Sequence, residues 1–346
     1  MRCLSDYHHS SLLRSTVMLF EERLGFDVFR PIGMDWFKEG FWAINSQEDT
    51  ARQFLDIDSQ PTDGTPPLNK PLARDNRMNV CFKVRDPGDK THHWACTLDH
   101  FKRVKFDYVI ASIPAHVEPF KRLIAKYNPE AKLIIQMGNN WNLDYYEGEN
   151  VLASIEPRTS RANAIFYHQE FDLDIFSQTP VPISKKIHSY VNVIGEIPMA
   201  WNSYDTLKKH LEPRGWEVKS FGGQCPDGNM TGPVELADSM YHAEFILHVK
   251  PQGDGYGHIL HNAYAMGRPV ITHSRHYQGQ LGSRLLMPGT FIDIDCFGGI
   301  EGAMAYIENM PDEEVKLMGQ LAYERFKEVV DFESEAKAIG EWLETL

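Results

Sequence analysis

Residues 244–271, EFILHVKPQGDGYGHILHNAYAMGRPVI, constrain the fold of this chain more than any other stretch. Glu244–Val249 is a short, largely apolar run bounded by a proline, which is typical of a buried strand. A loop with Gly253, Gly255 and Gly257 follows, and apolar residues then recur at helical spacing up to a glycine placed to end a helix. The stretch predicts strand, glycine loop, helix and next strand, which is the repeating unit of an α/β protein.

The glycine loop lies at the carboxyl end of a strand and opens a helix. Open α/β sheets bind ligands at this place, and a helix start offers unpaired N–H groups and a positive dipole to a phosphate. The spacing is neither the dinucleotide fingerprint nor a Walker A loop, because no acidic residue and no Gly-Lys-Ser/Thr follow at the required positions. The loop therefore predicts either a phosphate site or a tight turn that only packs well.

Residues 251–271, PQGDGYGHILHNAYAMGRPVI, resemble the donor-site segment of GT-B glycosyltransferases, which often reads P-x-x-E-G-F-G-x-x-x-x-E-A-M-A-x-G-x-P-V-I. Asp254 falls on the first acidic position of that segment and Asn262 on the second. The resemblance implies a loop and helix that bind the diphosphate and sugar of a nucleotide-sugar. It also implies two Rossmann-like α/β domains that face each other across a crevice, with a C-terminal helix that can cross back to the first domain.

The resemblance and the loop together give a set of donor-binding candidates. GT-B relatives usually carry an Arg and a Lys after the first strand of the second domain, but this chain has no Arg there, and we expect Lys250 or Arg275 to replace them. The alternative for both is an ordinary solvated ion pair. The complete set is Gly195, Lys250, Gly253, Asp254, Gly255, Tyr256, Gly257, His258, Asn262 and Arg275.

His8 and His9 are the candidates for acid–base chemistry, together with Asp254 as a residue that holds the sugar. The two histidines follow a short predicted strand, and histidine titrates near neutral pH. They serve as a base only if the reaction inverts configuration, with Asp6 as the other candidate; the likeness of residues 251–271 to retaining enzymes favours retention. Alternatively, the pair is a solvated loop before a helix capped by serine.

The length of 346 residues predicts two domains, and the strand–helix pattern restarts after a stiff, proline-bearing stretch at Thr179–Lys186. We assign residues 1–183 to an N-terminal, acceptor-side domain, 184–330 to a donor domain and 331–346 to the final helix. Within these domains we expect a strand at Ser189–Ile194 and a turn at Asp86–His93. The aromatic stretch Met34–Ile44 is either an acceptor platform or a packed excursion.

The composition limits the classes of partner and cofactor that we expect for this chain. The net charge of −13 argues against a non-specific grip on nucleic acid and makes modified DNA bases a minor alternative as acceptor. The five cysteines include no CxxC pair, and no carboxylate or Cys lies at a ligand spacing near His92–His93. The turns at 56–58, 172–174 and 293–295 resemble the Asp-x-Asp metal motif of the other glycosyltransferase fold, but short acidic turns occur by chance, so we expect no divalent metal. No signal core or membrane-length apolar run is present, which favours a cytoplasmic chain.

These observations predict a glycosyltransferase that uses a UDP- or GDP-linked sugar, needs no other cofactor, and acts on an acceptor that the sequence does not identify. Two alternatives remain. The first is another enzyme on the same scaffold, such as a nucleotide-sugar epimerase. The second is a non-catalytic nucleotide-sugar binder, which Asn262 and the missing Arg/Lys pair favour.

Overall fold

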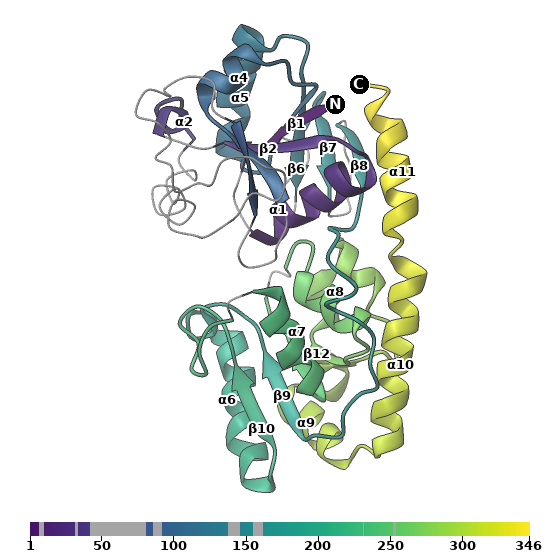
Figure 1. Cartoon of the computed structure of the whole chain (residues 1–346). Helices are drawn as coiled ribbons and strands as arrows, with labels where there is room; N and C mark the ends of the chain where they lie inside the picture. Colours follow the sequence, from purple (N-terminus) through teal and green to yellow (C-terminus); the bar gives the residue numbers. More distant parts are fainter. Residues whose placement is uncertain are drawn as a thin grey trace. The chain divides into compact units, whose positions relative to one another are not determined.

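The computed structural model describes residues 1–6, 10–31, 34–41, 81–85, 92–137, 146–154, 162–230, 232–251 and 254–346. The chain forms two compact units. Unit 1 contains residues 1–171 together with 332–346, and unit 2 contains residues 172–331 (Figure 1).

Unit 1 is built on a mixed sheet. Among the described residues its strand order is β3-β4-β2-β1-β5-β6-β7-β8, and every pair is parallel except β3 with β4. The strands are β1 (Arg2–Ser5), β2 (Asp27–Pro31), β3 (Cys81–Arg85), β4 (His92–Cys96), β5 (Tyr108–Ala111), β6 (Lys132–Met137), β7 (Asn150–Ala153) and β8 (Asn163–Phe166). The chain order reverses between β1 and β5, which makes their carboxyl ends the switch point of this sheet.

Helices cover both faces of the unit 1 sheet, and apolar residues of the central strands pack into a core on each face. The helices are α1 (Ser10–Val17), which continues as a π-helix (Met18–Arg23), α2 (Met34–Lys38), α4 (Leu98–Arg103), α5 (Pro114–Tyr127) and α11 (Phe332–Leu343).

The C-terminal helix α11 is part of unit 1. Its buried residues Ala336, Ile339 and Leu343 join the same apolar cluster as residues of β1, α1 and the π-helix. Glu335 adds a polar contact, because its carboxylate accepts hydrogen bonds from the backbone N–H and the Nδ1 of His168, both at 2.6 Å. Figure 1 shows α11 beside the sheet of unit 1, near the N-terminus.

Unit 2 is built on a parallel sheet with the described order β10-β9-β11-β12-β13. Its strands are β9 (Lys186–Ser189), β10 (Glu217–Ser220), β11 (Phe245–Leu247), β12 (Val270–Thr272) and β13 (Phe291–Asp293). Its helices are α6 (Pro198–Leu211), α7 (Pro233–His242), α8 (His258–Ala265), α9 (Ile300–Asn309) and α10 (Asp312–Val329). In chain order the sheet reads 2-1-3-4-5, so its switch point lies at the carboxyl ends of β9 and β11.

The sheets confirm the α/β fold class, but two local predictions need correction. The strand predicted at Ser189–Ile194 is wrong, since β9 ends at Ser189 and Val193 adopts a left-handed conformation with φ of 50°. The turn predicted at Asp86–His93 is also wrong at its end, because His92 and His93 lie in β4, whose antiparallel partner is β3.

For the aromatic stretch Met34–Ile44, the structure favours the packed alternative over the acceptor platform at Trp36 and Phe41. Trp36 and Phe41 are completely buried, their rings meet edge to face at 5.4 Å, and Trp36 Nε1 donates to the Cys96 carbonyl. These two rings are therefore core residues of unit 1 and do not form a platform.

The boundary between the units lies at residues 171 and 172, and the stretch Thr179–Lys186 belongs to unit 2. Arg268, which is completely buried, holds this stretch: Nη1 donates to the Thr179 carbonyl and Nη2 to the Thr179 hydroxyl. The guanidinium also donates to the carbonyls of Met240, Tyr241 and Met266.

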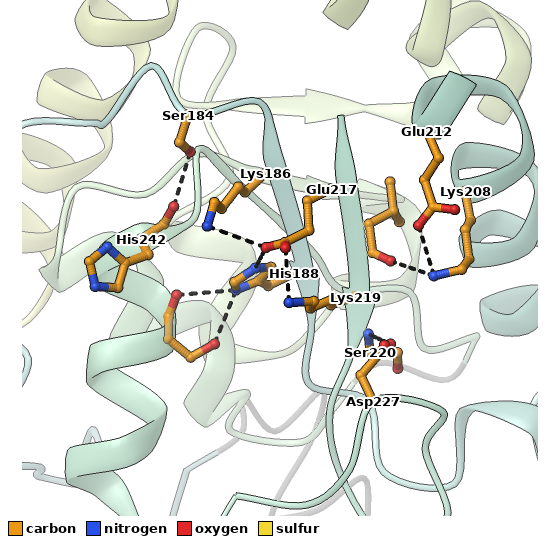
Figure 2. A network of polar contacts seen from close by, with 12 residues as sticks. Ser184, Lys186, His188, Lys208, Glu212, Glu217, Lys219, Ser220, Asp227 and His242 are labelled. Atoms are coloured by element: carbon orange, nitrogen blue, oxygen red, sulfur yellow. Dashed lines mark hydrogen bonds and ion pairs between the residues drawn. The ribbon is translucent and has the colours of Figure 1, made fainter. Parts of the chain in front are cut away.

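A network of charged side chains connects the neighbouring strands β9 and β10 at one edge of the unit 2 sheet (Figure 2). The Glu217 carboxylate on β10 lies between Lys219, at 2.9 Å, and Lys186 of β9, at 3.4 Å. The buried His188 on β9 joins Glu217 to α7, since its Nδ1 lies 3.1 Å from the Ser239 carbonyl and its Nε2 lies 3.4 Å from Glu217 Oε1.

No helix in the described part of the chain is long and apolar enough to cross a membrane.

Candidate functional site

The loop between β11 and α8 lies at the switch point of unit 2. His248 directly follows β11, whose last residue Leu247 pairs with Ser189 at the end of β9. Gly255 and Gly257 have φ of 60° and 79°, a left-handed conformation that favours glycine. The Gly257 N–H donates to the Asp254 carbonyl at 3.0 Å, which closes the loop immediately before α8.

Asp254 is the centre of a partly buried charged cluster. His248 Nε2 donates to Asp254 Oδ2 at 3.0 Å, and the Lys250 ammonium group forms an ion pair with Asp254 Oδ1. Burial acts to raise the pKa of Asp254, but the hydrogen bond and charge of His248 and the charge of Lys250 outweigh it and hold that pKa well below its usual value. The Asp254 carboxylate is therefore ionised at any physiological pH.

Gln280 fixes the backbone of the same loop from another segment. Its side-chain Oε1 accepts from the Asp254 N–H at 3.2 Å, while its Nε2 donates to the His276 carbonyl at 3.2 Å. Gln280 is almost completely buried. The cluster is thus held from β11, from the loop and from the segment after β12.

The start of α8 has no side-chain cap. Gly257 occupies the N-cap position and provides no side-chain cap, so the first-turn N–H groups receive no side-chain hydrogen bond from that residue. Asn262, one turn further on, is buried, and its Oδ1 has no hydrogen-bond partner among the described residues. An unpaired polar atom in a buried position is costly, which points to a ligand or water that pairs with it.

Tyr256 and His258 form the wall of this helix start. The completely buried Tyr256 ring stacks on His261 of α8 with ring centroids 4.0 Å apart and contacts His258 edge-on at 4.8 Å. This packing explains how the loop keeps its shape.

Arg275 follows β12, the strand beside β11. Its guanidinium forms a 2.9 Å ion pair with Asp295, which also contacts His273 Nδ1 at 2.8 Å. Burial, His273 and Arg275 together lower the pKa of the neighbouring His276. Just over half of the Arg275 side chain is exposed, so the guanidinium remains accessible beside its carboxylate partner.

Gly195 lies after β9, in a short 3-10 turn at the same end of the sheet. A Cβ atom on Gly195 would meet nothing within 4 Å. The structure thus places Gly195, Lys250, Asp254, Gly257 and Arg275 on segments that follow the carboxyl ends of three neighbouring strands of unit 2.

His8, His9 and Gly253 lie outside the described residues. Asp6, the other candidate for a base, is described at the switch point of unit 1, where its carboxylate is fully occupied. It accepts from the backbone and hydroxyl of Ser112, from the Ile113 N–H, and from His116 Nδ1 at 2.8 Å. This arrangement fastens β1 to the start of α5, so Asp6 has the contacts of a structural residue.

Two contributors to the unit 2 cluster were missed in the sequence. His248 carried a signal, since it is a polar residue at the carboxyl end of a predicted buried strand. Gln280 carried none, because nothing in its neighbourhood indicates a contact with a residue 26 positions earlier. Within the described residues, no group of three or more His, Cys, Asp or Glu side chains has the arrangement of a metal site.

Comparisons with known proteins agree with this geometry. No family model matches the chain, and no curated protein matches its sequence. Solved structures do match over essentially their whole length. HepE of Anabaena, solved with UDP-glucose, is 10% identical with a TM-score of 0.63, and both chains are covered completely.

Two further structures are similar. An α-glucosyltransferase, solved with UDP and a 13-mer DNA containing an HMU base, is 9% identical, with a TM-score of 0.60 and 99% of each chain covered. TarM is 10% identical, with a TM-score of 0.58, 99% of this chain and 98% of TarM covered. The chain therefore has the GT-B fold of glycosyltransferases, as the segment 251–271 predicted.

Proposed function

Because this chain has the GT-B fold, we propose that it is a glycosyltransferase that moves a sugar from a UDP-sugar to an acceptor, with retention of configuration. Unit 2 is the donor side and unit 1 the acceptor side. The observation that carries the proposal is the start of α8 at the switch point, where an uncapped helix end, Lys250 and the unpaired Oδ1 of Asn262 are brought together by one loop and helix.

The chemistry assigns a role to each part. Sugar transfer develops positive charge on the sugar and negative charge on the departing phosphate. The N–H groups at the start of α8 and the Lys250 and Arg275 side chains supply the positive environment for the phosphate. Asn262 is the acceptor for a ribose hydroxyl, and the ionised Asp254 is the acceptor for a sugar hydroxyl. UDP is the proposed nucleotide because similar structures were solved with UDP or UDP-glucose.

A second candidate function, a nucleotide-sugar binder without turnover, is favoured by one observation. Both cations proposed for the diphosphate are already paired with carboxylates, Lys250 with Asp254 and Arg275 with Asp295. Turnover separates the two functions, because a binder retains UDP-glucose without releasing UDP.

The test is UDP binding followed by turnover. UDP at about one hundred times its Kd is expected to stabilise the protein by about 2.7 kcal/mol, which raises Tm by roughly 5 °C. Asn262→Leu is expected to weaken UDP binding at least about tenfold, because it removes a buried, neutral hydrogen-bond acceptor. Asn309→Leu, at the exposed end of α9, is the matched control and should leave UDP affinity unchanged.

Release of UDP from UDP-glucose, UDP-galactose or UDP-N-acetylglucosamine then identifies an enzyme. Binding without release supports the binder. If neither UDP nor any of these sugars raises Tm, the start of α8 is not a donor site and the proposal fails.

A further inference from the structure

The Lys250 ammonium group is held by a carboxylate of its own loop. It forms an ion pair with Asp254, and the two side chains are only 29% and 18% exposed. A partly desolvated ion pair is stronger than a pair on the open surface. A diphosphate that contacts Lys250 must therefore compete with Asp254 for it.

Asp254 also lies where an incoming anion is attracted. Its Cβ lies 4.0 Å from the point where a Cβ on Gly257, the N-cap of α8, would stand. The start of a helix favours negative charge within its first turn. The carboxylate and a donor diphosphate are thus rivals both for Lys250 and for the helix end.

The position of Asp254 does not depend on Lys250 alone. His248, which is completely buried, holds Oδ2 through its Nε2, and Gln280 holds the Asp254 backbone N–H. If Lys250 departs, these two contacts therefore keep the carboxylate in place. Only Oδ1, the oxygen that Lys250 occupied, becomes available to another donor.

We propose that the donor binds by exchange of this ion pair. The diphosphate draws Lys250 away from Asp254, and the freed Oδ1 then accepts a hydroxyl group of the donor sugar. The inference rests on the proposed function, namely that the donor diphosphate binds at the start of α8. Its distinctive consequence is that Asp254 opposes a nucleotide without a sugar, since that ligand takes Lys250 and returns no hydroxyl group to the carboxylate.

The test is a double-mutant cycle on UDP affinity, measured by titration calorimetry on the full chain. Asp254→Asn keeps the shape of the side chain but releases Lys250, so we expect UDP to bind at least about fivefold tighter. Lys250→Met is expected to weaken UDP at least about fivefold. The double variant should match Lys250→Met, because the gain from Asp254→Asn requires a lysine to release.

Asp205 and Lys209 provide the matched control. They form an ion pair of the same residue types and spacing on α6, in the same unit but on an exposed helix surface. Asp205→Asn and Lys209→Met should each change UDP affinity by less than about twofold. Thermal melts of all variants report whether the fold is retained.

Two results overturn the exchange. One is a weaker affinity for UDP in Asp254→Asn, which would mean that the carboxylate supports the diphosphate. The other is an equal gain from Asp254→Asn with and without Lys250, which would reflect repulsion alone. Both results leave the proposed function standing, whereas a wild-type protein that fails to bind UDP removes the proposed function and the exchange together.

Discussion

At the scale of single residues, Arg268 shows how unit 2 uses a cation without a carboxylate. Its guanidinium is completely buried, and its partners are backbone carbonyls and one hydroxyl. Burial lowers the pKa of Arg268 to about 10, which still leaves it charged at neutral pH. Because it fastens Thr179 to the turn after α8, Arg268 orders the first part of unit 2 around the helix that carries the candidate site.

Arg268→Lys is expected to destabilise the protein by about 3 kcal/mol or more, because one ammonium group cannot replace a planar fork and several buried carbonyls lose their partners. Urea unfolding measures the change. Arg214→Lys is the control, since just under half of the Arg214 side chain is exposed and it pairs with Glu308. Its unfolding free energy should stay within about 0.5 kcal/mol of the wild type. Equal effects of the two substitutions would contradict the role of Arg268.

His188 and Glu217 make the free energy of unfolding depend on pH. The hydrogen bond from Lys219, opposed by burial and assisted by His188 and the nearby lysines, lowers the pKa of Glu217 to about 2. Burial lowers the pKa of His188, against the attraction of Glu217. Both groups bind protons more readily when unfolded. Their stabilisation is therefore complete above pH 6.5 for His188 and above about pH 4.5 for Glu217, and each is lost as the pH falls below that value.

We expect His188→Gln to reduce the loss of unfolding free energy between pH 6.5 and pH 5, as followed by urea unfolding at each pH. His242→Gln, on the exposed end of α7, should leave the slope as it is in the wild type. The Glu217 contribution at lower pH is expected to stay below about 1 kcal/mol, because its side chain is 35% exposed and screened by solvent. An unchanged slope in His188→Gln would contradict this role of the histidine.

At the scale of elements, α10 packs so closely against the end of α8 that position 319 has no room for a side chain. A Cβ on Gly319 of α10 would lie 2.1 Å from Val181 Cγ2 and 2.5 Å from the Gly267 carbonyl oxygen. Gly267 ends α8 with φ of 69°. The close contact therefore sets the position of the helix whose other end forms the candidate site.

Gly319→Ala is expected to destabilise the protein by about 2 kcal/mol or more, although alanine in a helix interior is normally better than glycine by about 1 kcal/mol. Gly195→Ala, which meets open space, should leave the unfolding free energy nearly unchanged. Calorimetry or urea unfolding measures whether Gly319→Ala lowers or raises the unfolding free energy. A more stable Gly319→Ala would show that α10 can shift.

The elements also show what the sequence could predict. Residues 251–271 predicted a loop and a helix because glycine position and apolar period are local signals, and their resemblance to the donor-site segment of GT-B enzymes predicted the fold. The strand at Ser189–Ile194 was misplaced because its β-branched residues fit a strand, whereas the register of β9 is set by Ile187 in the core. Gln280 and Arg268 could not be assigned, since their roles depend on contacts with residues distant in the chain.

At the scale of the whole molecule, unit 1 is discontinuous and unit 2 is continuous. Residues 1–171 need 332–346 to complete the apolar cluster that contains Ile339 and Leu343. Unit 2, residues 172–331, has a separate apolar core, and all five described strands of its sheet come from this one segment. The two units should therefore respond differently to the loss of the C-terminal helix.

A chain ending at Asp331 is expected to lose the stability of unit 1 and keep that of unit 2. Scanning calorimetry should show an early transition for unit 1 and a later one for unit 2, because the apolar surface beneath α11 is exposed. Leu317→Ala, an exposed leucine on α10, is a control that should leave the melting profile intact. A single transition at the wild-type temperature would contradict the assignment of α11 to unit 1.

The same discontinuity has a consequence for the order of events during synthesis. Unit 2 is synthesised as one uninterrupted piece, whereas residues 1–171 of unit 1 wait for residues 332–346. A candidate donor site can thus be assembled while the other half of the molecule still lacks its final helix. Since the Tyr108 hydroxyl of β5 donates to the Leu343 carbonyl of α11, a chain that stalls before residue 332 leaves this contact unmade.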